Sequence, residues 1–408
     1  MTAREYPVFT VTPKAERSLR AGHPWVYGEE VTAVEGAYQN GDMVDVVSNK
    51  GRYLGTGWVN DQSKIRVRII SRNANDTFDE AFFRRRVCYA LNYRKTVMGP
   101  VDYRCCRLIF GEADQFPGLT VDRFENILVT QVLSLGMERR KDWVYRALVE
   151  LLREDDEQID AIYERNDVAI RTLEGLEQGK GFYQMEGLKT DLSGHVTITE
   201  NGIKYDVDYI EGQKTGFFLD QKYNRQAAAK LARGRRVLDC FTHTGAFALN
   251  AAAAGAEHVT AVDVSAFALE LAAENGKRNG LTNLDYKCAD VFDLLTEMAK
   301  EKKCDYDYII LDPPAFTKSR ATAKNAYHGY KEINRKAMRL LPRGGYLATC
   351  SCSHFMTDEM FRKMLQEAAL DAGVTLRQIE ARQQAPDHPI LPEVPETDYL
   401  KFYLLQVV

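Results

Sequence analysis

The sequence predicts an α/β protein whose C-terminal region, residues 193–408, forms a doubly wound sheet with parallel strands. Apolar strand-like runs alternate with helix-like runs in this region, which is typical of such sheets. An aspartate or a cysteine follows each predicted strand, where ligands bind in this fold class. The sequence patterns of residues 1–75 and 76–192 differ from that of the C-terminal region. They predict a small β domain and an α+β domain, respectively.

Length and composition limit the number of domains and the class of protein to which the chain can belong. A chain of 408 residues exceeds one compact core, so two or three domains are expected. Its net charge of −4 excludes a globally basic nucleic-acid binder, although a local basic face remains compatible. No apolar signal segment or membrane span is expected. Eight irregularly spaced cysteines indicate free thiols, so we expect a cytoplasmic protein.

The two N-terminal regions have distinct predicted elements. In the first, short alternating runs predict strands, and one helix is expected at 13–22. These strands are expected at 43–49, 53–59 and 64–70. In the second, a charged amphipathic helix, two strands and another helix are expected at 77–97, 119–124, 127–133 and 141–154. This order indicates an α+β domain.

The C-terminal region repeats strand and helix. Predicted strands are 235–240, 258–264, 283–290, 306–312 and 344–351. Predicted helices are 245–256, 266–280, 324–341 and 358–373. Because the carboxyl ends of parallel strands share one edge, the residues after the strands are expected to form the site.

Four successive strand ends carry acids, Asp239, Asp263, Asp290 and Asp312, that together suit an adenosine. Asp239 leads through a turn with Gly245 into a helix, but the turn is neither GxGxxG nor a P-loop, so a diphosphate is disfavoured. Asp263 suits two ribose hydroxyls and Asp290 suits an adenine amino group. Taken singly, each aspartate is more often a helix cap. Together they predict an adenosine site without a phosphate site.

Several motifs resemble class I S-adenosylmethionine-dependent methyltransferases. They are "VLDCFTHTGAFALNAAAAGA", "VTAVDVS", "LDPPAFTKS" and "TCSCSHFM". With "RSLRAGHPWVYGEEV" and "EGQKTGFFLDQKYNR", nearly the whole chain resembles the bacterial 23S ribosomal RNA cytosine-C5 methyltransferases that carry an N-terminal PUA domain. This resemblance implies a PUA-like RNA-binding domain (1–75), a central α+β domain (76–192) and a Rossmann-like methyltransferase domain with a mixed seven-stranded sheet (193–408).

The resemblance also implies site residues and partners. The residues implied to bind S-adenosylmethionine are Gln221, Asn224, Arg225, Asp239, Phe241, Gly245, Asp263, Val264, Asp290 and Val291. Cys352 and Asp312 match the catalytic cysteine and the acid beside the target base. The implied partner is 23S ribosomal RNA, naked or in the large subunit, and a homodimer is one option for the oligomeric state.

Cys350 and Cys352 pose a choice of roles. Zinc is disfavoured because the other cysteines and histidines lack zinc-like spacing, and a disulfide two residues apart would be strained. Cys350 fits packing, on the same strand face as Ala348. Cys352 fits a nucleophile: its thiolate adds to carbon 6 of cytosine and makes carbon 5 nucleophilic, with Asp312 on the base edge. A helix capped by Thr357 follows and favours the thiolate.

Two other functions stay open. Methylation of guanine N7 or N2 needs no cysteine, because those nitrogens attack the sulfonium directly. A non-catalytic ribosome-assembly factor that binds RNA is the second alternative. For carbon-5 chemistry, the group that removes the carbon-5 proton is also open, with His354, His328 and a water held by Asp312 as candidates.

Two further segments suggest RNA contacts. The basic tract 83–95 is either a phosphate-binding helix face or a solvated one. Lys324, Tyr327 and Tyr330 are placed to stack on and clamp a base, although tyrosines at this spacing more often pack a helix.

Overall fold

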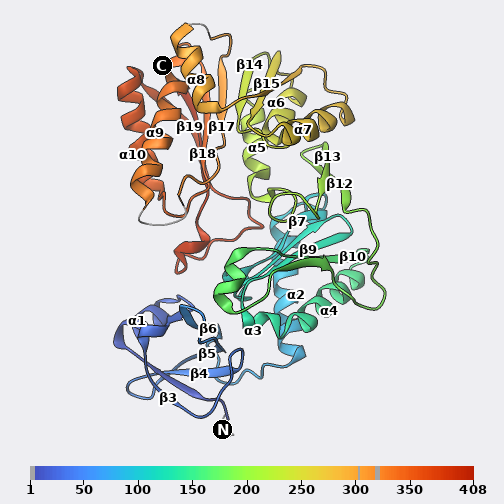
Figure 1. Ribbon diagram of the computed structural model, residues 1–408, viewed down its shortest axis with the longest axis vertical. Coiled ribbons are helices and arrows are strands. Elements are labelled where there is room, and N and C mark those ends of the chain that lie inside the picture. Colours follow the sequence, from blue (N-terminus) through green and yellow to red (C-terminus); the bar gives the residue numbers. More distant parts are fainter. Residues whose placement is uncertain (1–4, 302–303, 318–321) are drawn as a thin grey trace. The chain divides into compact units, whose positions relative to one another are not determined.

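The computed structural model describes residues 5–301, 304–317 and 322–408 (Figure 1). The chain forms two compact units. Unit 1 comprises Met1–Ile198, Val207–Leu219 and Pro386–Thr397, and unit 2 comprises Thr199–Asp206, Asp220–Ala385 and Asp398–Val408. Lys318 and Ser319 of the "LDPPAFTKS" motif lie outside the described residues.

Unit 1 begins with a six-stranded sheet in the order β2-β6-β5-β4-β1-β3. Its elements are β1 (Val8–Val11), α1 (Pro13–Ala21), β2 (Trp25–Tyr27), β3 (Val31–Glu35), β4 (Met43–Ser48), β5 (Tyr53–Val59) and β6 (Ile65–Ser71). The Thr12 side chain accepts from the Ala15 N–H and caps α1, while Gly22 ends the helix in the left-handed region. The small β domain with one helix is therefore confirmed.

A second sheet in unit 1 has the order β11-β10-β9-β8-β7. The elements around it are α2 (Glu80–Val97), β7 (Cys105–Phe110), β8 (Leu119–Phe124), β9 (Ile127–Val132), α3 (Leu135–Glu138), α4 (Lys141–Glu154), β10 (Ala161–Asn166) and β11 (Gly179–Phe182). Asp79 caps α2 by accepting from the Phe82 N–H at 2.9 Å. The helices expected at 77–97 and 141–154 and the strands expected at 119–124 and 127–133 correspond to α2, α4, β8 and β9.

Unit 2 contains a seven-stranded sheet in the order β16-β15-β14-β17-β18-β20-β19. The strands are β14 (Arg236–Cys240), β15 (His258–Asp263), β16 (Leu284–Cys288), β17 (Tyr308–Leu311), β18 (Tyr346–Ser351), β19 (Leu376–Arg382) and β20 (Lys401–Val407). The first five are parallel, and β20 runs antiparallel beside β18. A short two-stranded sheet, β12 (His195–Glu200) and β13 (Ile203–Asp208), precedes it along the chain. The mixed seven-stranded sheet is confirmed.

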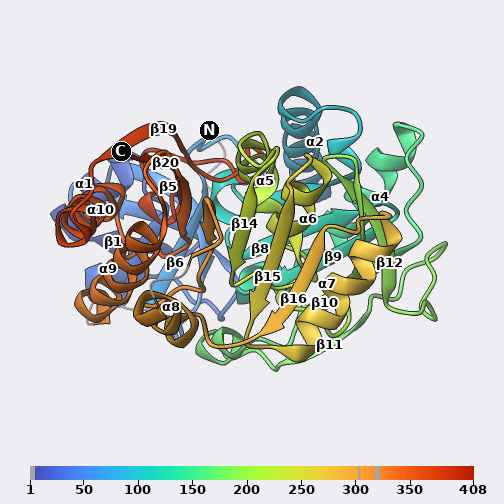
Figure 2. The same ribbon diagram turned by 90° about the horizontal axis from the view of Figure 1, so that it is seen from above.

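Helices cover both faces of this sheet (Figures 1 and 2). They are α5 (Lys222–Ala229), α6 (Ala246–Ala253), α7 (Ala266–Arg278), α8 (Val291–Glu301), α9 (Ala323–Leu340) and α10 (Asp358–Ala372). One apolar cluster joins the sheet to α8, α9 and α10, and another joins it to α5 and α6. Figure 2 shows β14, β15 and β16 side by side with α6 and α7 along them.

Elements of unit 2 that were not anticipated include α5, α8, β19 and β20. The strands β19 and β20 form the antiparallel edge of the sheet. The alternation of strands and helices does not predict such an edge. Within the described parts of the chain, no helix has both the length and the apolar character needed to cross a membrane.

Candidate active site

Four strands of the unit 2 sheet bring their carboxyl ends to one edge. Asp239 lies near the end of β14, and Asp263 closes β15. Asp312 follows β17 and Cys352 follows β18. Since β15, β14, β17 and β18 are parallel neighbours in that order, the four residues share one edge of the sheet. The predicted gathering of strand-end residues is confirmed.

The loop after β14 has an unusual backbone. Phe241, His243 and Gly245 have φ angles of 65°, 52° and 84°. A bulky residue such as phenylalanine rarely adopts a positive φ, and such strain concentrates at ligand sites. At Gly245 a side chain would collide with Leu249, so only glycine lets α6 begin there. The loop therefore presents backbone close to the strand edge, as a cofactor loop requires.

Asp239 is fully buried beneath this loop. Thr242 Oγ1 donates to its Oδ2 at 2.5 Å. Among the described residues, its Oδ1 is buried with no hydrogen-bond partner. Burial, assisted by the charges of Asp312 and Asp263 and opposed by the Thr242 hydrogen bond, raises the pKa of Asp239 to about 7. A buried carboxylate without a cationic partner indicates a site that a ligand completes.

Asp263 and Val264 present complementary chemistry at the end of β15. The Asp263 carboxylate accepts from the backbone N–H groups of His243 and Ser265, each at 2.9 Å. Each carboxylate oxygen has a second lone pair, so ribose hydroxyls remain compatible. Val264 beside it is 73% exposed, which provides an apolar surface for an adenine. Both roles stay predictions.

Asp290, the third predicted acid, has a structural role as a helix cap. Asp290 Oδ1 accepts from the Asp293 N–H at 3.1 Å and so caps α8. The Val291 side chain is buried in the apolar core, which leaves only its backbone for a ligand. The helix-cap interpretation therefore holds for Asp290, although its second oxygen can still accept from an adenine amino group.

The segment before β14 contributes polar residues from α5 and its approach. Gln221 Nε2 donates to Asp312 Oδ1 at 3.0 Å, and Asn224 Nδ2 donates to Gln221 Oε1 at 2.7 Å. Arg225 behaves differently: it forms a buried bidentate ion pair with Glu200, at 2.6 and 2.9 Å. Gln221 and Asn224 thus reach the strand edge, whereas the Arg225 charge is already compensated.

Asp312 is the second acid at this edge whose pKa is raised. Burial, assisted by the charge of Asp220 and opposed by the charge of Arg225, raises the pKa of Asp312 to about 6. Asp220 Oδ2 in turn accepts from Tyr399 Oη at 2.6 Å. Asp220 and Tyr399 were not among the predicted residues, because neither lies at the end of a predicted strand.

Together, Asp220, Asp239, Asp263 and Asp312 make the edge strongly negative. Their mutual repulsion, seen in the raised pKa values of Asp239 and Asp312, would be relieved by a positively charged ligand. S-adenosylmethionine carries both a sulfonium and an ammonium, so its charge fits this donor set. The residues present therefore fit the cofactor.

The two cysteines occupy different surroundings. Cys350 is fully buried and packs with Ala348 and Phe402 in one apolar cluster. Its predicted packing role is confirmed, and its thiol also lies near the side chains of Asp312 and Gln221. Burial raises the pKa of the Cys350 thiol, so it is not suited to be a thiolate.

Cys352 leaves the sheet and is partly exposed. Its Sγ lies 4.0 Å from the carbonyl oxygen of Pro313, in the loop that begins with Asp312. The N-terminus of α10 follows, with Thr357 Oγ1 accepting from the Met360 N–H at 3.3 Å as predicted. Both thiols therefore lie near the Asp312 loop, but Cys350 is fully buried whereas Cys352 is partly exposed.

The candidate proton acceptors and base-stacking residues differ in exposure. His354 Nδ1 is buried and has no hydrogen-bond partner among the described residues, whereas His328 is exposed on α9. Tyr330 is fully buried in the core, so helix packing explains it. Lys324 is exposed and Tyr327 is partly buried, which leaves both available for an RNA base.

The basic tract of α2 is largely occupied by ion pairs within unit 1. Arg84 binds Glu150 and Glu154, each at 2.7 Å. Arg94 and Lys95 pair with acids as well. The solvated interpretation accounts for these residues, and Arg86 is the exception.

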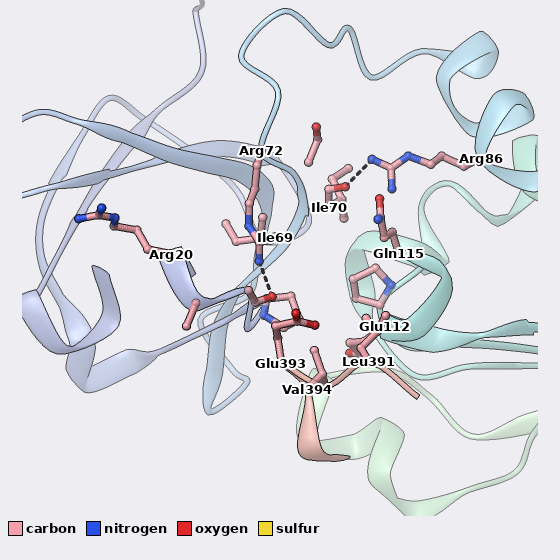
Figure 3. A pocket seen from close by; sticks show the side chains of 15 residues that line it. Arg20, Ile69, Ile70, Arg72, Arg86, Glu112, Gln115, Leu391, Glu393 and Val394 are labelled. Carbon is pink, nitrogen blue, oxygen red and sulfur yellow. Dashed lines mark hydrogen bonds between the residues drawn. The ribbon is translucent and has the colours of Figure 1, made fainter. Parts of the chain in front are cut away.

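A cavity of about 450 Å³ in unit 1 contains Arg86 and Arg72 (Figure 3). Arg86 Nη2 donates to the Ile70 carbonyl at 2.9 Å, and Arg72 donates to the Gly22 carbonyl. Within the described residues, Arg86 Nη1 is buried and unpartnered. Burial lowers the pKa of both guanidinium groups. Two arginines bonded to carbonyls rather than carboxylates indicate affinity for an anion.

Two family models match the chain. Residues 9–72 match a PUA-like domain, and residues 182–405 match an S-adenosylmethionine-dependent methyltransferase. Among solved structures, a chain from Streptococcus mutans described as a SAM-dependent methyltransferase has a TM-score of 0.81 at 22% identity and covers 98% of this chain and 100% of its own length. A second methyltransferase-like structure, complexed with SAH, has a TM-score of 0.82 at 22% identity. These likenesses show the fold.

Curated relatives match over nearly the full length. The ribosomal RNA large subunit methyltransferase I of Photobacterium profundum is 42% identical over 395 residues, 96% of this chain and 97% of the relative. The protein of the same description from Aeromonas salmonicida is 42% identical over 391 residues, 95% and 96% of the two chains. The chain therefore belongs to the S-adenosylmethionine-dependent methyltransferases, in the family of ribosomal RNA large subunit methyltransferase I.

Proposed function

We propose that this enzyme methylates carbon 5 of a cytosine in 23S ribosomal RNA, with Cys352 as the nucleophile. The observation that carries the proposal is the position of Cys352: its thiol is partly exposed where β18 ends, and its Sγ lies 4.0 Å from the Pro313 carbonyl in the Asp312 loop. A nitrogen methyltransferase has no use for a thiol at this point. The names of the relatives support ribosomal RNA as the substrate.

The strand-edge acids bind and orient the methyl donor. Asp263 and Val264 hold the adenosine, while the strained loop from Asp239 to Gly245 approaches it closely. When bound, S-adenosylmethionine supplies a methyl group on a positively charged sulfur. Asp239 and Asp312 favour that charge, because each carboxylate lies in a buried setting that disfavours ionisation without a cation.

Cys352 then activates the base. Its thiolate forms a bond to carbon 6, which makes carbon 5 able to attack the methyl group. After methylation, the carbon-5 proton leaves to a base, and the bond between Sγ and carbon 6 breaks to restore the cysteine. Asp312 carries a proton for part of the time at neutral pH, since its pKa is raised to about 6, so it can donate to the ring edge during addition.

Unit 1 supplies RNA contacts in this proposal. Residues 9–72 match the PUA-like domain, and Arg72 and Arg86 offer guanidinium groups to a phosphate. Arg86→Gln in the full chain should weaken RNA binding about uniformly across sequences and lower the salt dependence by about one charge. Arg84→Gln, which removes an arginine already paired with two glutamates, is the matched control. Equal effects of the two variants would contradict the assignment.

The remaining expectations belong to the same proposal. Ribosomal RNA as substrate implies action in the cytoplasm. The functional boundaries at residues 75 and 192, between RNA-binding, central and methyltransferase domains, stay our proposal, as does a homodimer.

The test is covalent capture on RNA that contains 5-fluorocytosine, which cannot lose a proton from carbon 5. Wild type should form a stable covalent complex, and Cys352→Ala should form none while it binds S-adenosylmethionine normally. The methyl-transfer rate of Cys352→Ala on ordinary RNA should fall by at least about 10³-fold. Near-normal transfer by Cys352→Ala, with no adduct in wild type, would instead support guanine N7 or N2 methylation. Failure of wild type to transfer methyl groups to any RNA would support a binding factor.

A further inference from the structure

Lys401 is a buried lysine next to the proposed nucleophile. It is 3% exposed and is the first residue of β20, directly opposite Ser351, the last residue of β18. Cys352 follows Ser351 in the chain. The register of the two strands therefore brings the base of the Lys401 side chain to the point where the cysteine leaves the sheet.

The Lys401 ammonium is held by backbone carbonyls. Nζ donates to Ser353 O at 2.7 Å and to Tyr399 O at 2.9 Å. Ser353 is the residue after Cys352, and its own Oγ donates to Thr317 O at 3.2 Å. Lys401 thus fixes the backbone on the carboxyl side of the cysteine, while β18 fixes the amino side.

The Lys401 charge has no carboxylate within ion-pair distance in the described part of the chain. A buried ammonium with only carbonyl partners is costly, and such a charge is normally compensated by an anion. Burial lowers the pKa of Lys401 to about 8, against the charges of Asp398, Cys352 and Asp358. Asp398 lies in the turn before β20, Cys352 where β18 ends, and Asp358 at the start of α10. Asp398 Oδ2 accepts from Gln383 and Asp358 Oδ1 accepts from Tyr403, whereas Asp398 Oδ1 is buried with no hydrogen-bond partner among the described residues.

We propose that Lys401 is a positioning residue that fixes the loop of Cys352 and stabilises its thiolate with a buried positive charge. The inference rests on the proposed role of Cys352. Attraction between two groups is reciprocal: because the cysteine anion favours the charged lysine, the charged lysine favours the cysteine anion. A thiolate at this place supplies the anion that the ammonium lacks, and the charged pair is complete before the base arrives.

The test is the pH dependence of cysteine alkylation by iodoacetamide, followed at the Cys352 peptide by mass spectrometry in the full chain. In Lys401→Met the midpoint for Cys352 should move to higher pH by about one unit, which corresponds to about tenfold slower alkylation near neutral pH. Lys401→Arg, which keeps the charge, should move it less. The exposed Cys288 in the same protein is the internal reference and should not move.

Lys336→Met is the matched control variant. The Lys336 ammonium donates to Phe292 O and to Thr296 Oγ1 on α8. The substitution therefore removes a packed lysine that makes no contact with the cysteine loop in these hydrogen bonds. An unchanged Cys352 midpoint in Lys401→Met, with normal S-adenosylmethionine binding, would overturn the proposal and leave Lys401 a structural tie. An equal shift in Lys336→Met would also overturn it.

A measurement on wild type decides the matter if Lys401→Met does not fold. A partly buried thiol without a nearby cation should titrate above the exposed Cys288, since burial disfavours its anion. The proposal requires the Cys352 midpoint to lie at or below that of Cys288, and a higher midpoint overturns it. Because alkylation needs no RNA, a failed 5-fluorocytosine capture would contradict the proposed function separately from this inference.

Discussion

The arginines of unit 1 and the aspartates of unit 2 illustrate two uses of buried charge. Arg94, fully buried, is bound by Asp114, and Arg107 forms a bidentate pair with Asp122 at 2.7 and 2.8 Å. In unit 2, burial raises the pKa values of Asp239 and Asp312, to about 7 and about 6. Compensated charges belong to the fold, whereas these two acids lie where our proposal puts the ligand.

Substitutions of the paired charges in unit 1 and of the acids in unit 2 should have different consequences for stability and for ligand binding. Removing one partner of a buried pair leaves the other charge uncompensated, so the fold should suffer. Removing a strand-edge acid relieves repulsion in the ligand-free protein, so ligand binding should suffer more than stability. The two regions can therefore be separated by measuring unfolding and cofactor affinity in the same variants.

The largest expected effect is in unit 1. Arg94→Met should lower the free energy of unfolding by about 3–5 kcal/mol, because Asp114 is left buried without its cation. Urea denaturation followed by circular dichroism measures this. Arg84→Met, on the same helix but exposed, should cost less than about 1 kcal/mol. Similar losses in both variants would remove the distinction between buried and exposed pairs.

Asp263→Ala should weaken S-adenosylmethionine binding more than tenfold, with a smaller loss of stability because the N–H groups of His243 and Ser265 lose their acceptor. The reason is the loss of two ribose hydrogen bonds to a charged acceptor, each of about 1.5–3 kcal/mol. Isothermal titration calorimetry measures the affinity. Asp285→Ala, which removes an acid on the neighbouring strand β16, is the control and should bind normally. Unchanged affinity in Asp263→Ala would refute the assignment.

Most of the fold could be predicted from the sequence, because hydrophobic periodicity and turn residues are local signals. Alternating runs predicted β4, β5 and β6, and apolar runs between helices predicted the parallel strands of unit 2. The strands β19 and β20 escaped because they pair with each other and with β18 only through long-range contacts. Lys401 and Tyr399 lie at or before β20, so they could not be assigned to the site before that pairing was known.

The site followed the strand-end rule only in part. The rule expected Asp239, Asp312 and Cys352 at the carboxyl ends of parallel strands, and the structure has them there, while their roles stay predictions. It gave no warning that Glu200, on β12, would take the Arg225 charge, because that ion pair joins elements distant in sequence. Partners of buried charges are tertiary information, whereas their positions on strands are local.

The acids of unit 2 also predict a pH dependence. Asp239 and Asp312 ionise near pH 7 and pH 6, so S-adenosylmethionine binding should tighten several-fold as the pH rises through that range. SAH lacks the sulfonium charge, so its affinity should change less. Because the native pKa values are raised, the folded protein binds more protons than the unfolded chain above about pH 4, and the stability of the free protein should fall as the pH rises toward 7. Parallel curves for the two ligands would contradict this account.

The smallest expected effect concerns Cys350, the buried counterpart of Cys352. Cys350→Ala should lower the free energy of unfolding by about 1 kcal/mol, because it leaves a small void beside Ala348 and Phe402. Its effect on covalent capture should be slight, since no bond to the base passes through this thiol. Urea denaturation and 5-fluorocytosine capture should be measured on the same preparation. If Cys350→Ala abolishes the adduct while Cys352→Ala retains it, the buried thiol is the nucleophile, and partial exposure at the strand end does not identify the reactive cysteine.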